Sequence, residues 1–302
     1  MTSPARVAAG PGRLRAWVIA ARVPTLTAAV TPVVVGTAVA VRTDAFAAGP
    51  GVAALVGAVA LQVGANLAND VSDFRRGADS AARIGPARVT ALGMLSERDV
   101  LAGMWGAFGV ATLAGVYLTW IAGWAVVAAG LASVVAAITY TGGPWPFGYR
   151  GLGELFVFVF FGLVAVAGTT FVQAGVLLRD AVAAAIPVGC TVTAILVVNN
   201  VRDLETDRAA GKRTLAVYLG RRRARAQYVG TIIAAYAAAA LLWPVAGFSP
   251  WVLLSWLSLP LVLAPARAVL TRTDGPPLNL ALRSTARLHF VFGVLLAVGV
   301  SM

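Results

Sequence analysis

Long apolar segments follow one another along almost the whole chain, and the short stretches between them carry most of the charged residues. A transmembrane helix needs about 20 consecutive, mostly apolar residues. Nine segments meet this requirement, near residues 17–41, 51–69, 99–119, 122–140, 153–174, 182–200, 227–247, 251–270 and 281–300. The pattern predicts an all-α integral membrane protein whose nine transmembrane helices surround a central cavity.

The composition agrees with the bilayer as the solvent of this protein. Hydrophobic residues make up 59% of the 302 residues and charged residues 12%, with a mean hydropathy of +0.84. An ordinary soluble domain is about 45–50% apolar, so a water-soluble enzyme and a disordered chain are both excluded. Cys190 is the single cysteine, which excludes a disulfide scaffold. We expect one polytopic domain over residues 1–302, with residues 1–13 as a flexible cytoplasmic tail.

The basic residues are unevenly distributed over the predicted loops. Lysine and arginine total 24 against 12 acidic residues, a net charge of +12. With a cytoplasmic N-terminus, the loops on the opposite side hold only Arg42 and Arg179. The positive-inside rule therefore predicts an N-terminus in the cytoplasm and a C-terminus outside. Positive charge on so apolar a chain favours a membrane surface over nucleic acid, and the arginine and alanine content favours a bacterial plasma membrane.

Half of the acidic residues form two groups, each at the predicted cytoplasmic end of an apolar segment. The first group, in NLANDVSDFRRGAD, follows Asn66 and Asn69 and comprises Asp70, Asp73 and Asp79. The second group, in NNVRDLETDRAAGKR, follows Asn199 and Asn200 and comprises Asp203, Glu205 and Asp207. Because acidic residues are so few in this chain, two matched groups indicate a function.

Helical spacing places each group on one side of its helix. Asn199, Asp203 and Asp207 are four residues apart, and Asn66, Asp70 and Asp73 follow the same stripe pattern. Carboxylates one turn apart repel each other, so burial near a bilayer requires a bound cation. Hard oxygen ligands suit Mg²⁺, whereas ligands for zinc or copper are missing because His289 and Cys190 stand alone.

A simpler alternative is that both groups are solvated helix ends. Neighbouring arginines would then neutralise the aspartates, and the candidates are Arg75, Arg76, Arg202 and Arg208. The occurrence of two matched groups favours the metal site over this alternative.

The two groups resemble the motifs of the UbiA superfamily of intramembrane prenyltransferases, N-D-x-x-D-x-x-x-D and D-x-x-x-D. Asn69, Asp70 and Asp73 match the first motif, and Asp203 and Asp207 match the second. The chain departs from the first motif at its last position, which is Gly77 here, so that the nearest acidic residue is Asp79.

Three longer segments are similar to the 1,4-dihydroxy-2-naphthoate prenyltransferase branch of that superfamily. They read GPARVTALGMLS, TYTGGPWPFGYRGLGELFVFVFFG and NNVRDLETDRAAGKRTLAV. The resemblance implies Mg²⁺-dependent transfer of a polyprenyl group from polyprenyl diphosphate to 1,4-dihydroxy-2-naphthoate in the membrane. The prenyl group replaces the ring carboxylate, which leaves as CO₂, and the product is the demethylmenaquinone of menaquinone biosynthesis.

The chemistry assigns a role to each candidate residue. Two Mg²⁺ ions neutralise the leaving diphosphate, and the expected metal ligands are Asp70, Asp73, Asp203, Asp207 and Asp79. We expect the substrates to contact Asn66, Asn69, Asn199, Lys212, Arg213, Arg22 and Arg88.

Within that set, Lys212 and Arg213 are expected on the diphosphate, and Arg22 or Arg88 on the acceptor carboxylate. Tyr140 is expected to orient the acceptor or to stabilise the allylic cation. Each of these assignments has a simpler alternative. Lys212 and Arg213 are also explained as positive-inside loop charge, Arg22 as a side chain that snorkels to the interface, and Tyr140 as an interfacial tyrosine.

Other functions remain open from the sequence. A related prenyltransferase acting on hydroxybenzoate, haem or chlorophyllide would share the metal site and differ in the acceptor pocket. A cation-coupled secondary transporter would need acidic residues near the middle of its spans. A catalytically idle scaffold would not need intact aspartates, and the sequence leaves protein partners unknown.

Overall fold

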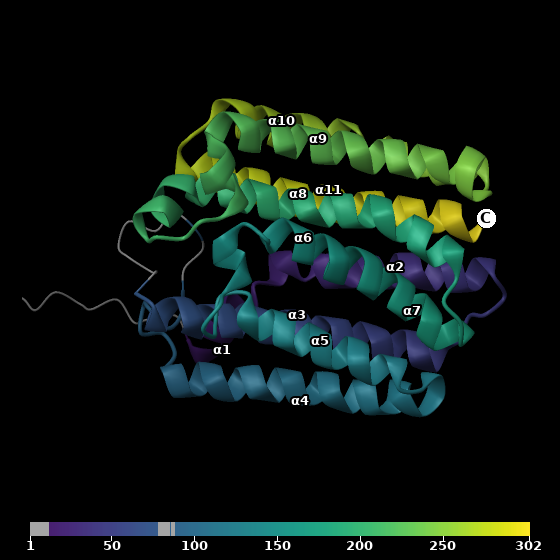
Figure 1. The fold of residues 1–302 in the computed structure, drawn as a ribbon, viewed down its shortest axis with the longest axis horizontal. Helices are drawn as coiled ribbons and strands as arrows, with labels where there is room; N and C mark the ends of the chain where they lie inside the picture. Colours follow the sequence, from purple (N-terminus) through teal and green to yellow (C-terminus); the bar gives the residue numbers. More distant parts are fainter. Residues whose placement is uncertain (1–11, 78–84, 86–87) are drawn as a thin grey trace, which may run out of the picture.

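The computed structural model describes residues 12–77, 85 and 88–302, and its regular secondary structure in these ranges is entirely helical (Figure 1). The elements are α1 (Arg13–Ala21), η1 (Val23–Thr25), α2 (Thr27–Arg42), α3 (Ala48–Arg75), α4 (Glu97–Ala122), α5 (Ala125–Thr139), η2 (Phe147–Arg150), α6 (Gly153–Val157), η3 (Phe158–Val164), α7 (Ala165–Ala174), α8 (Arg179–Ala209), α9 (Leu215–Ala246), η4 (Pro250–Ser258), α10 (Pro260–Thr271) and α11 (Gly275–Ser301).

Every predicted apolar segment falls on a helix or on a bent helix pair. Among the described residues, six helices are long and apolar enough to cross a membrane, and eight when each bent pair counts as one span. The remaining apolar helix, α5, has 15 residues. The chain is thus a multi-pass helical membrane protein, as predicted, while the number of nine crossings stays a prediction.

Two of the predicted spans are bent rather than continuous. The first is broken between η1 and α2 by 49°, and the eighth is broken by 49° between η4 and α10. Pro24 lies in η1, and Pro260 begins α10. Proline has no backbone N–H for the helical hydrogen bond and its φ is fixed, so the helix axis often bends or breaks at such positions.

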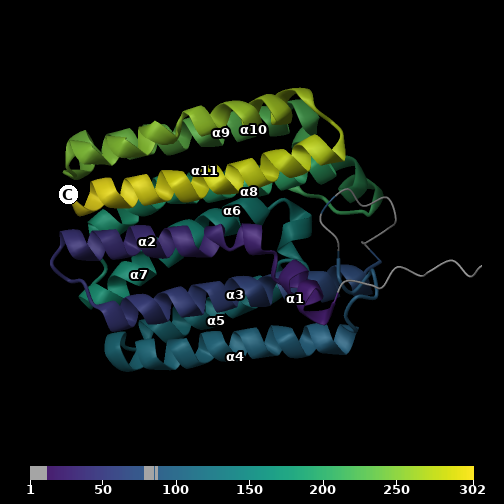
Figure 2. The same cartoon turned by 180° about the vertical axis from the view of Figure 1, so that it is seen from behind.

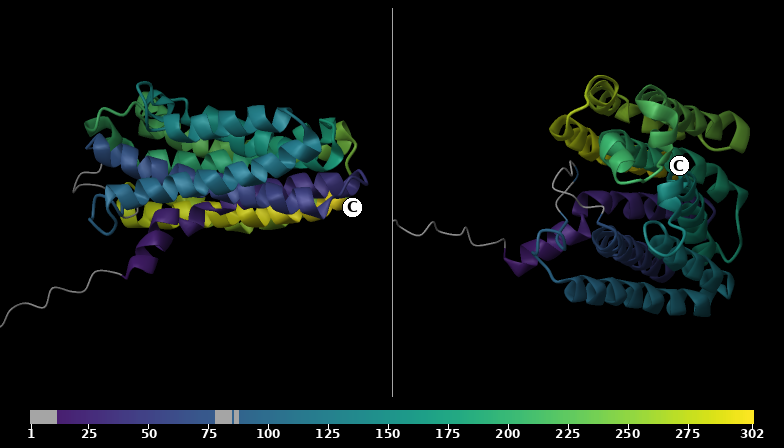
Figure 3. Two further views of the ribbon diagram at one scale, coloured as in Figure 1. Left: turned by 90° about the horizontal axis from the view of Figure 1, so that it is seen from below. Right: turned by 60° about the vertical axis from the view of Figure 1, so that its left-hand side comes forward.

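The long helices run side by side along the long axis of the molecule (Figures 1 and 2). The helices α3, α5, α8 and α10 all finish at the same end of the bundle, on the left in Figure 1, and the C-terminus lies at the opposite end. We call the former the carboxylate end, because Asp73 in α3 and Asp203 and Asp207 in α8 lie near it. The short α1 projects away from the other helices there (Figure 3).

Two apolar cores hold the bundle together. One packs α2 and α7 through α11, with Val35, Val188 and Leu288 fully buried. The other packs α1, α3 and α4 around Leu67 and Val100. The space between these cores is the cavity described below.

The segment η3 packs against α8 at a crossing of two glycines. A Cβ atom at Gly162 would lie 2.6 Å from the Cα atom of Gly189, and one at Gly189 would lie 2.8 Å from the ring of Phe158. Small residues at such crossings let helix backbones approach closely in membrane proteins. Close packing here fixes the position of α6 and η3 relative to α8.

We expect Gly162→Ala to lower the stability of the protein by about 1–3 kcal/mol, because the new methyl group meets backbone that cannot move independently. Thermal unfolding in detergent measures this effect. Gly230→Ala is the matched control, since a Cβ atom there meets nothing within 4 Å. Equal unfolding temperatures for the two variants would contradict the prediction.

Candidate active site

A cavity of about 750 Å³ lies between the two cores. The charged residues of its lining lie at the carboxylate end, and they are Arg22, Asp73, Arg88, Asp203, Asp207 and Lys212. The polar lining also includes Asn66, Asn69, Tyr140, Tyr149, Asn199 and Asn200. Its apolar lining includes Ala129, Ala136, Phe156, Phe160, Phe161 and Val164. The cavity therefore has a charged end and an apolar wall, which suits an amphiphilic ligand.

The first acidic group enters the cavity from the last turns of α3. Asn66, Asn69 and Asp73 line it, at the spacing of one helical face. Asp70 is not among the lining residues. It is buried beside this face, and its carboxylate accepts a hydrogen bond from the backbone N–H of Thr90 at 3.2 Å. The predicted stripe thus holds for Asn66 and Asp73, and the metal-ligand role of Asp70 stays a prediction.

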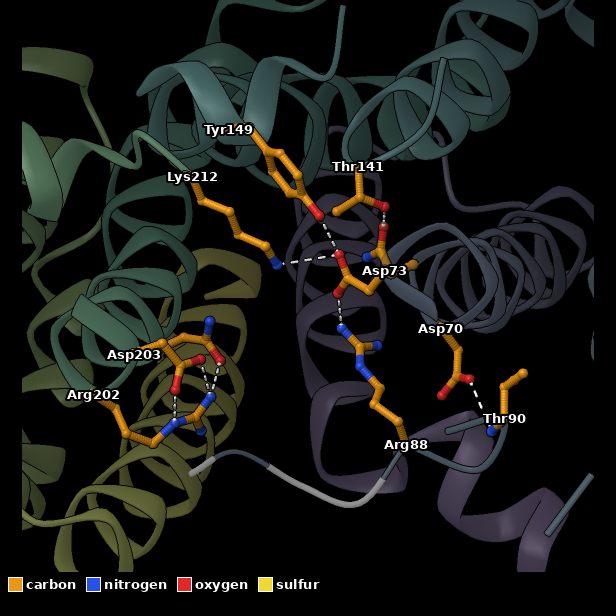
Figure 4. A network of polar contacts seen from close by, with 11 residues as sticks. Asp70, Asp73, Arg88, Thr90, Thr141, Tyr149, Arg202, Asp203 and Lys212 are labelled. Atoms are coloured by element: carbon orange, nitrogen blue, oxygen red, sulfur yellow. Dashed lines mark hydrogen bonds and ion pairs between the residues drawn. The ribbon is translucent and has the colours of Figure 1, made fainter. Parts of the chain in front are cut away.

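Asp73 is the centre of a buried polar network (Figure 4). Its carboxylate is paired with the guanidinium of Arg88 and with Lys212 Nζ, which lies 3.2 Å from Oδ1. The hydroxyl of Tyr149 donates a hydrogen bond to the same carboxylate. Side chains from three other segments thus meet on one carboxylate. Arg88 and Lys212 together carry two positive charges, against the single negative charge of Asp73.

Tyr149 was not predicted as a site residue. It lies in η2, and Lys212 Nζ is 4.5 Å from the centre of its ring. Burial raises the pKa of its hydroxyl, and the charge of Asp73 raises it further, so Tyr149 stays protonated and donates to Asp73. The signal was present in the segment GGPWPFGYRGLGEL, where the tyrosine follows a predicted span that ends on the same side as the aspartates.

The second acidic group lies near the end of α8. Asn199, Asp203 and Asp207 all line the cavity, as their spacing predicts. Glu205 does not, because it is exposed and paired with Arg208 at 2.7 Å. All the cavity-lining carboxylates of α3 and α8 are therefore near helix ends, whereas the transporter alternative needs them near the middle of the spans.

A buried arginine holds the second group in place. Arg202 is 2% exposed. Its Nε and Nη2 atoms donate to Asp203 at 2.7 and 2.5 Å, and Nη2 also donates to the side-chain oxygen of Asn199 at 2.8 Å. Its Nη1 atom donates to Asn279 of α11 at 3.0 Å. Asp203 is thus neutralised by a neighbouring arginine, as the simpler alternative proposed. The pair lies inside the site, however, and not at a solvated helix end.

The predicted basic residues take different positions. Lys212 and Arg88 lie in the cavity and are paired with Asp73. Arg213 is exposed and is not among the lining residues, and its backbone N–H donates to the carbonyl of Tyr149 at 2.9 Å. Arg22 lines the cavity at the break after α1, with a left-handed backbone at φ 51°. Such a conformation is costly for a residue other than glycine and is typical of functional sites.

An aromatic row runs along one wall of the cavity. The ring centres of Tyr140 and Phe147 are 5.4 Å apart, those of Phe147 and Phe156 are 3.9 Å apart, and those of Phe156 and Phe160 are 6.0 Å apart. The π-helical segment η3 contains Phe160, and turns of this kind are frequent at functional sites. All four aromatic residues line the cavity, beside its charged end.

The donor set of the cavity fits Mg²⁺. The described residues contain no group of three His, Cys, Asp or Glu side chains close enough to enclose a metal ion by themselves. Mg²⁺ usually takes only one or two carboxylates and completes its octahedron with water and phosphate oxygens. Asp73, Asp203 and Asp207 can supply such ligands. Asp79 lies outside the described residues.

Comparison with known proteins agrees with this arrangement. Residues 29–295 match the sequence profile of the UbiA prenyltransferase family. A protein of Mycobacterium tuberculosis named 1,4-dihydroxy-2-naphthoate octaprenyltransferase is 38% identical over 281 residues, which cover 93% of this chain and 95% of the relative. The protein of that name from Escherichia coli is 34% identical, covering 94% of this chain and 96% of the relative.

Solved structures share the fold at lower identity. A UbiA homologue from Aeropyrum pernix superposes with a TM-score of 0.69 at 16% identity, covering 89% of this chain and 97% of that one. A UbiA homologue from Archaeoglobus fulgidus, solved bound to GPP and Mg²⁺, gives a TM-score of 0.64 at 14% identity, covering 95% and 99%. With the profile match over most of its length, this chain belongs to the UbiA prenyltransferase family.

Proposed function

We propose that the protein transfers a polyprenyl group from polyprenyl diphosphate to 1,4-dihydroxy-2-naphthoate in menaquinone biosynthesis. The observation that carries this proposal is one cavity with carboxylates from both α3 and α8 at one end and an apolar, aromatic wall beside them. An isoprenoid diphosphate has the same two parts. Relatives named for this reaction support the choice of the naphthoate acceptor.

The carboxylate end binds the diphosphate. Asp73, Asp203 and Asp207 would hold the metal, with Asp70 and Asp79 as further ligands, and we infer two ions. Mg²⁺ supplies neutralisation of the charge on the leaving diphosphate. Lys212 and Arg88 contribute further positive charge there, and Asn69 and Asn199 donate amide hydrogen bonds. The contact of Arg213 with the diphosphate stays a prediction, because Arg213 is exposed outside the cavity lining.

The aromatic wall encloses the isoprenoid and protects the allylic cation. Phe156 and Phe160 exclude water, which would otherwise react with the cation. The ring of Tyr140 stands at the head of the row, where its face stabilises positive charge and its hydroxyl orients the acceptor.

The acceptor is held by Arg22, whose guanidinium pairs with the ring carboxylate. The Nδ2 atom of Asn66 donates to the carbonyl of Ala21 at 3.0 Å and to Thr25 Oγ1 at 3.1 Å, which fixes the chain on both sides of Arg22. A ring carbon then bonds to the terminal prenyl carbon as the carbon–oxygen bond to the diphosphate breaks. The carboxylate leaves that ring carbon as CO₂, and its bonding electron pair restores the aromatic ring.

The proposed orientation places the carboxylate end in the cytoplasm of a bacterial cell, with nine crossings and the C-terminus outside. Arg75, Arg150 and Arg272 lie at or near helix ends on this side, whereas Arg42 and Arg179 lie on the other. This distribution is what the positive-inside rule requires. The same proposal treats residues 1–302 as one domain with residues 1–13 as its tail.

Product analysis tests the function. Purified protein in lipid vesicles receives a polyprenyl diphosphate with either 1,4-dihydroxy-2-naphthoate or hydroxybenzoate, and mass spectrometry identifies the product. We expect a prenylated naphthoquinol that has lost the carboxylate, and no product in a matched sample with EDTA until Mg²⁺ is restored. Prenylated hydroxybenzoate as the main product, or activity indifferent to EDTA, would overturn the proposal.

A further inference from the structure

A buried carboxyl–amide pair lies behind the cavity wall, outside the two acidic groups. Glu154, in the first turn of α6, is 6% exposed, and Asn200 of α8 is 5% exposed. The Nδ2 atom of Asn200 donates a hydrogen bond to Glu154 Oε1 at 2.9 Å. Asn200 lines the cavity, whereas Glu154 is not among its lining residues. The pair therefore has one member that can meet a ligand and one that lies behind it.

The second carboxyl oxygen of Glu154 is buried without a hydrogen-bond partner in the described part of the chain. Burial of a polar group without a partner is unfavourable, and ionisable residues inside membrane proteins are mostly functional. A carboxyl group at this position therefore needs an explanation beyond packing.

The hydrogen bond to Glu154 fixes the direction of the Asn200 amide. With one Nδ2 hydrogen bonded to Glu154, the amide plane is fixed, and the side-chain oxygen is an acceptor that Asn200 can offer to the cavity. Tyr140 lies near the pair and lines the same cavity as Asn200, since a Cβ atom at Gly153, the residue before Glu154, would be 3.2 Å from the hydroxyl oxygen of Tyr140. A hydrogen-bond acceptor thus lies beside the head of the aromatic row.

The chemistry of that oxygen selects its ligand. Diphosphate oxygens carry no protons at neutral pH, so an amide oxygen repels them and does not bind them. A phenolic hydroxyl donates a proton to such an acceptor, and an aromatic ring packs beside tyrosine and phenylalanine. Polarisation of the hydroxyl also makes the ring richer in electrons, which favours its attack on an allylic cation.

We propose that Asn200 accepts a hydrogen bond from a ring hydroxyl of the aromatic acceptor and that Glu154 is the positioning residue that holds the Asn200 amide in this direction. The inference rests on the proposed function and adds to it a determinant of acceptor specificity. It predicts that the enzyme distinguishes acceptors by the hydroxyl that meets Asn200.

The test combines Asn200→Ala, Glu154→Leu and Glu154→Gln with acceptor analogues that each lack one ring hydroxyl. We expect Asn200→Ala and Glu154→Leu to raise KM for the naphthoate about tenfold and to change KM for the prenyl diphosphate by less than about twofold. Glu154→Gln keeps an acceptor oxygen for Asn200 Nδ2, so we expect it to restore kcat/KM to within about threefold of the wild type.

The analogue comparison separates a contact from a structural effect. Removal of the hydroxyl that meets Asn200 should raise the equilibrium Kd of the acceptor about tenfold for the wild type and should leave it almost unchanged for Asn200→Ala. Glu97→Gln, which changes an exposed carboxylate paired with Arg75, is the control for the loss of a carboxylate. Thermal unfolding shows whether each variant is folded. If Glu154→Leu does not fold, Asn200→Ala keeps the test decisive, because it removes the proposed acceptor itself.

Two results would overturn the inference. One is that removal of the hydroxyl weakens acceptor binding equally in the wild type and in Asn200→Ala, for every analogue. The other is weaker Mn²⁺ binding to Asn200→Ala, measured by electron paramagnetic resonance without substrates, since it would make Asn200 a metal ligand. If the wild type prenylates hydroxybenzoate instead, the proposed function fails, and the same comparison is made with benzoate lacking its hydroxyl. Equilibrium binding of the acceptor, without prenyl diphosphate, provides the readout independent of turnover.

Discussion

Replacement of Asp73 with asparagine is expected to lower the turnover of the purified protein by about 10²–10³-fold. The variant keeps the size of the side chain but loses the negative charge that the metal requires. It also leaves Arg88 and Lys212 without the carboxylate that both now share. A rate assay with prenyl diphosphate and acceptor, both at saturating concentration, measures the change.

The control for Asp73→Asn is Asp99→Asn in α4. Asp99 caps its helix through Ser96 and pairs with Arg13 at an exposed position, away from the cavity lining. We expect this variant to keep its turnover within about twofold, because an exposed ion pair contributes little. Wild-type turnover in Asp73→Asn would remove that residue from the metal site.

Replacement of Arg202 with methionine is expected to lower the free energy of unfolding by about 2–4 kcal/mol, because the change removes a buried guanidinium and leaves the partly buried carboxylate of Asp203 without its cation. Asp203 would lose its ion pair, and Asn199 and Asn279 would each lose a hydrogen-bond donor. Denaturant unfolding in mixed micelles, followed by tryptophan fluorescence, measures the difference.

A second arginine on the same helix serves as the control for this measurement. Arg208 is 53% exposed and pairs with the exposed Glu205. We expect Arg208→Met to change the free energy of unfolding by less than about 1 kcal/mol. If the two variants unfold alike, the network around Arg202 does not stabilise the protein.

The membrane class and the positions of its helices were predictable because the bilayer imposes a minimum length of apolar chain. That constraint counts apolar residues and does not report the direction of the helix axis, so the bends after η1 and after η4 were missed. Pro24 and Pro260 mark both bends in the sequence. Proline is also tolerated inside helices of this protein, for example at Pro187 of α8, so its presence alone does not predict a bend.

The candidate site was predictable where its residues share one helix. The spacing of Asn199, Asp203 and Asp207 placed all of them on one face, and all of them line the cavity. The same argument was less accurate for Asp70, because a residue at the margin of a helical face turns toward whichever partner is nearer. That partner is the backbone of Thr90, in a connection whose path local spacing does not encode.

Contacts between segments far apart in the chain could not be predicted from local sequence patterns. Tyr149 meets Asp73 across 76 residues, and Asn200 meets Glu154 across 46 residues. Both Tyr149 and Glu154 belong to GYRGLGEL, whose glycines draw attention to backbone turns rather than to the polar side chains between them. The packing of α6 on α8 brings Glu154 to Asn200, and only the folded chain shows that Tyr149 of η2 meets Asp73 of α3.

The lengths of α3 and α8 have a consequence for where the donor substrate sits. With 28 and 31 residues, they measure about 42 and 46 Å at 1.5 Å per residue, more than the roughly 30 Å of hydrocarbon in a bilayer. Asp73 and Asp207 lie in the last turn of their helices, so in the proposed orientation the surplus length would place both at the level of the lipid headgroups. Under the proposed function, a pyrophosphate bound there would keep part of its hydration while its isoprenoid tail stays among acyl chains, and the donor would react without changing its depth in the membrane.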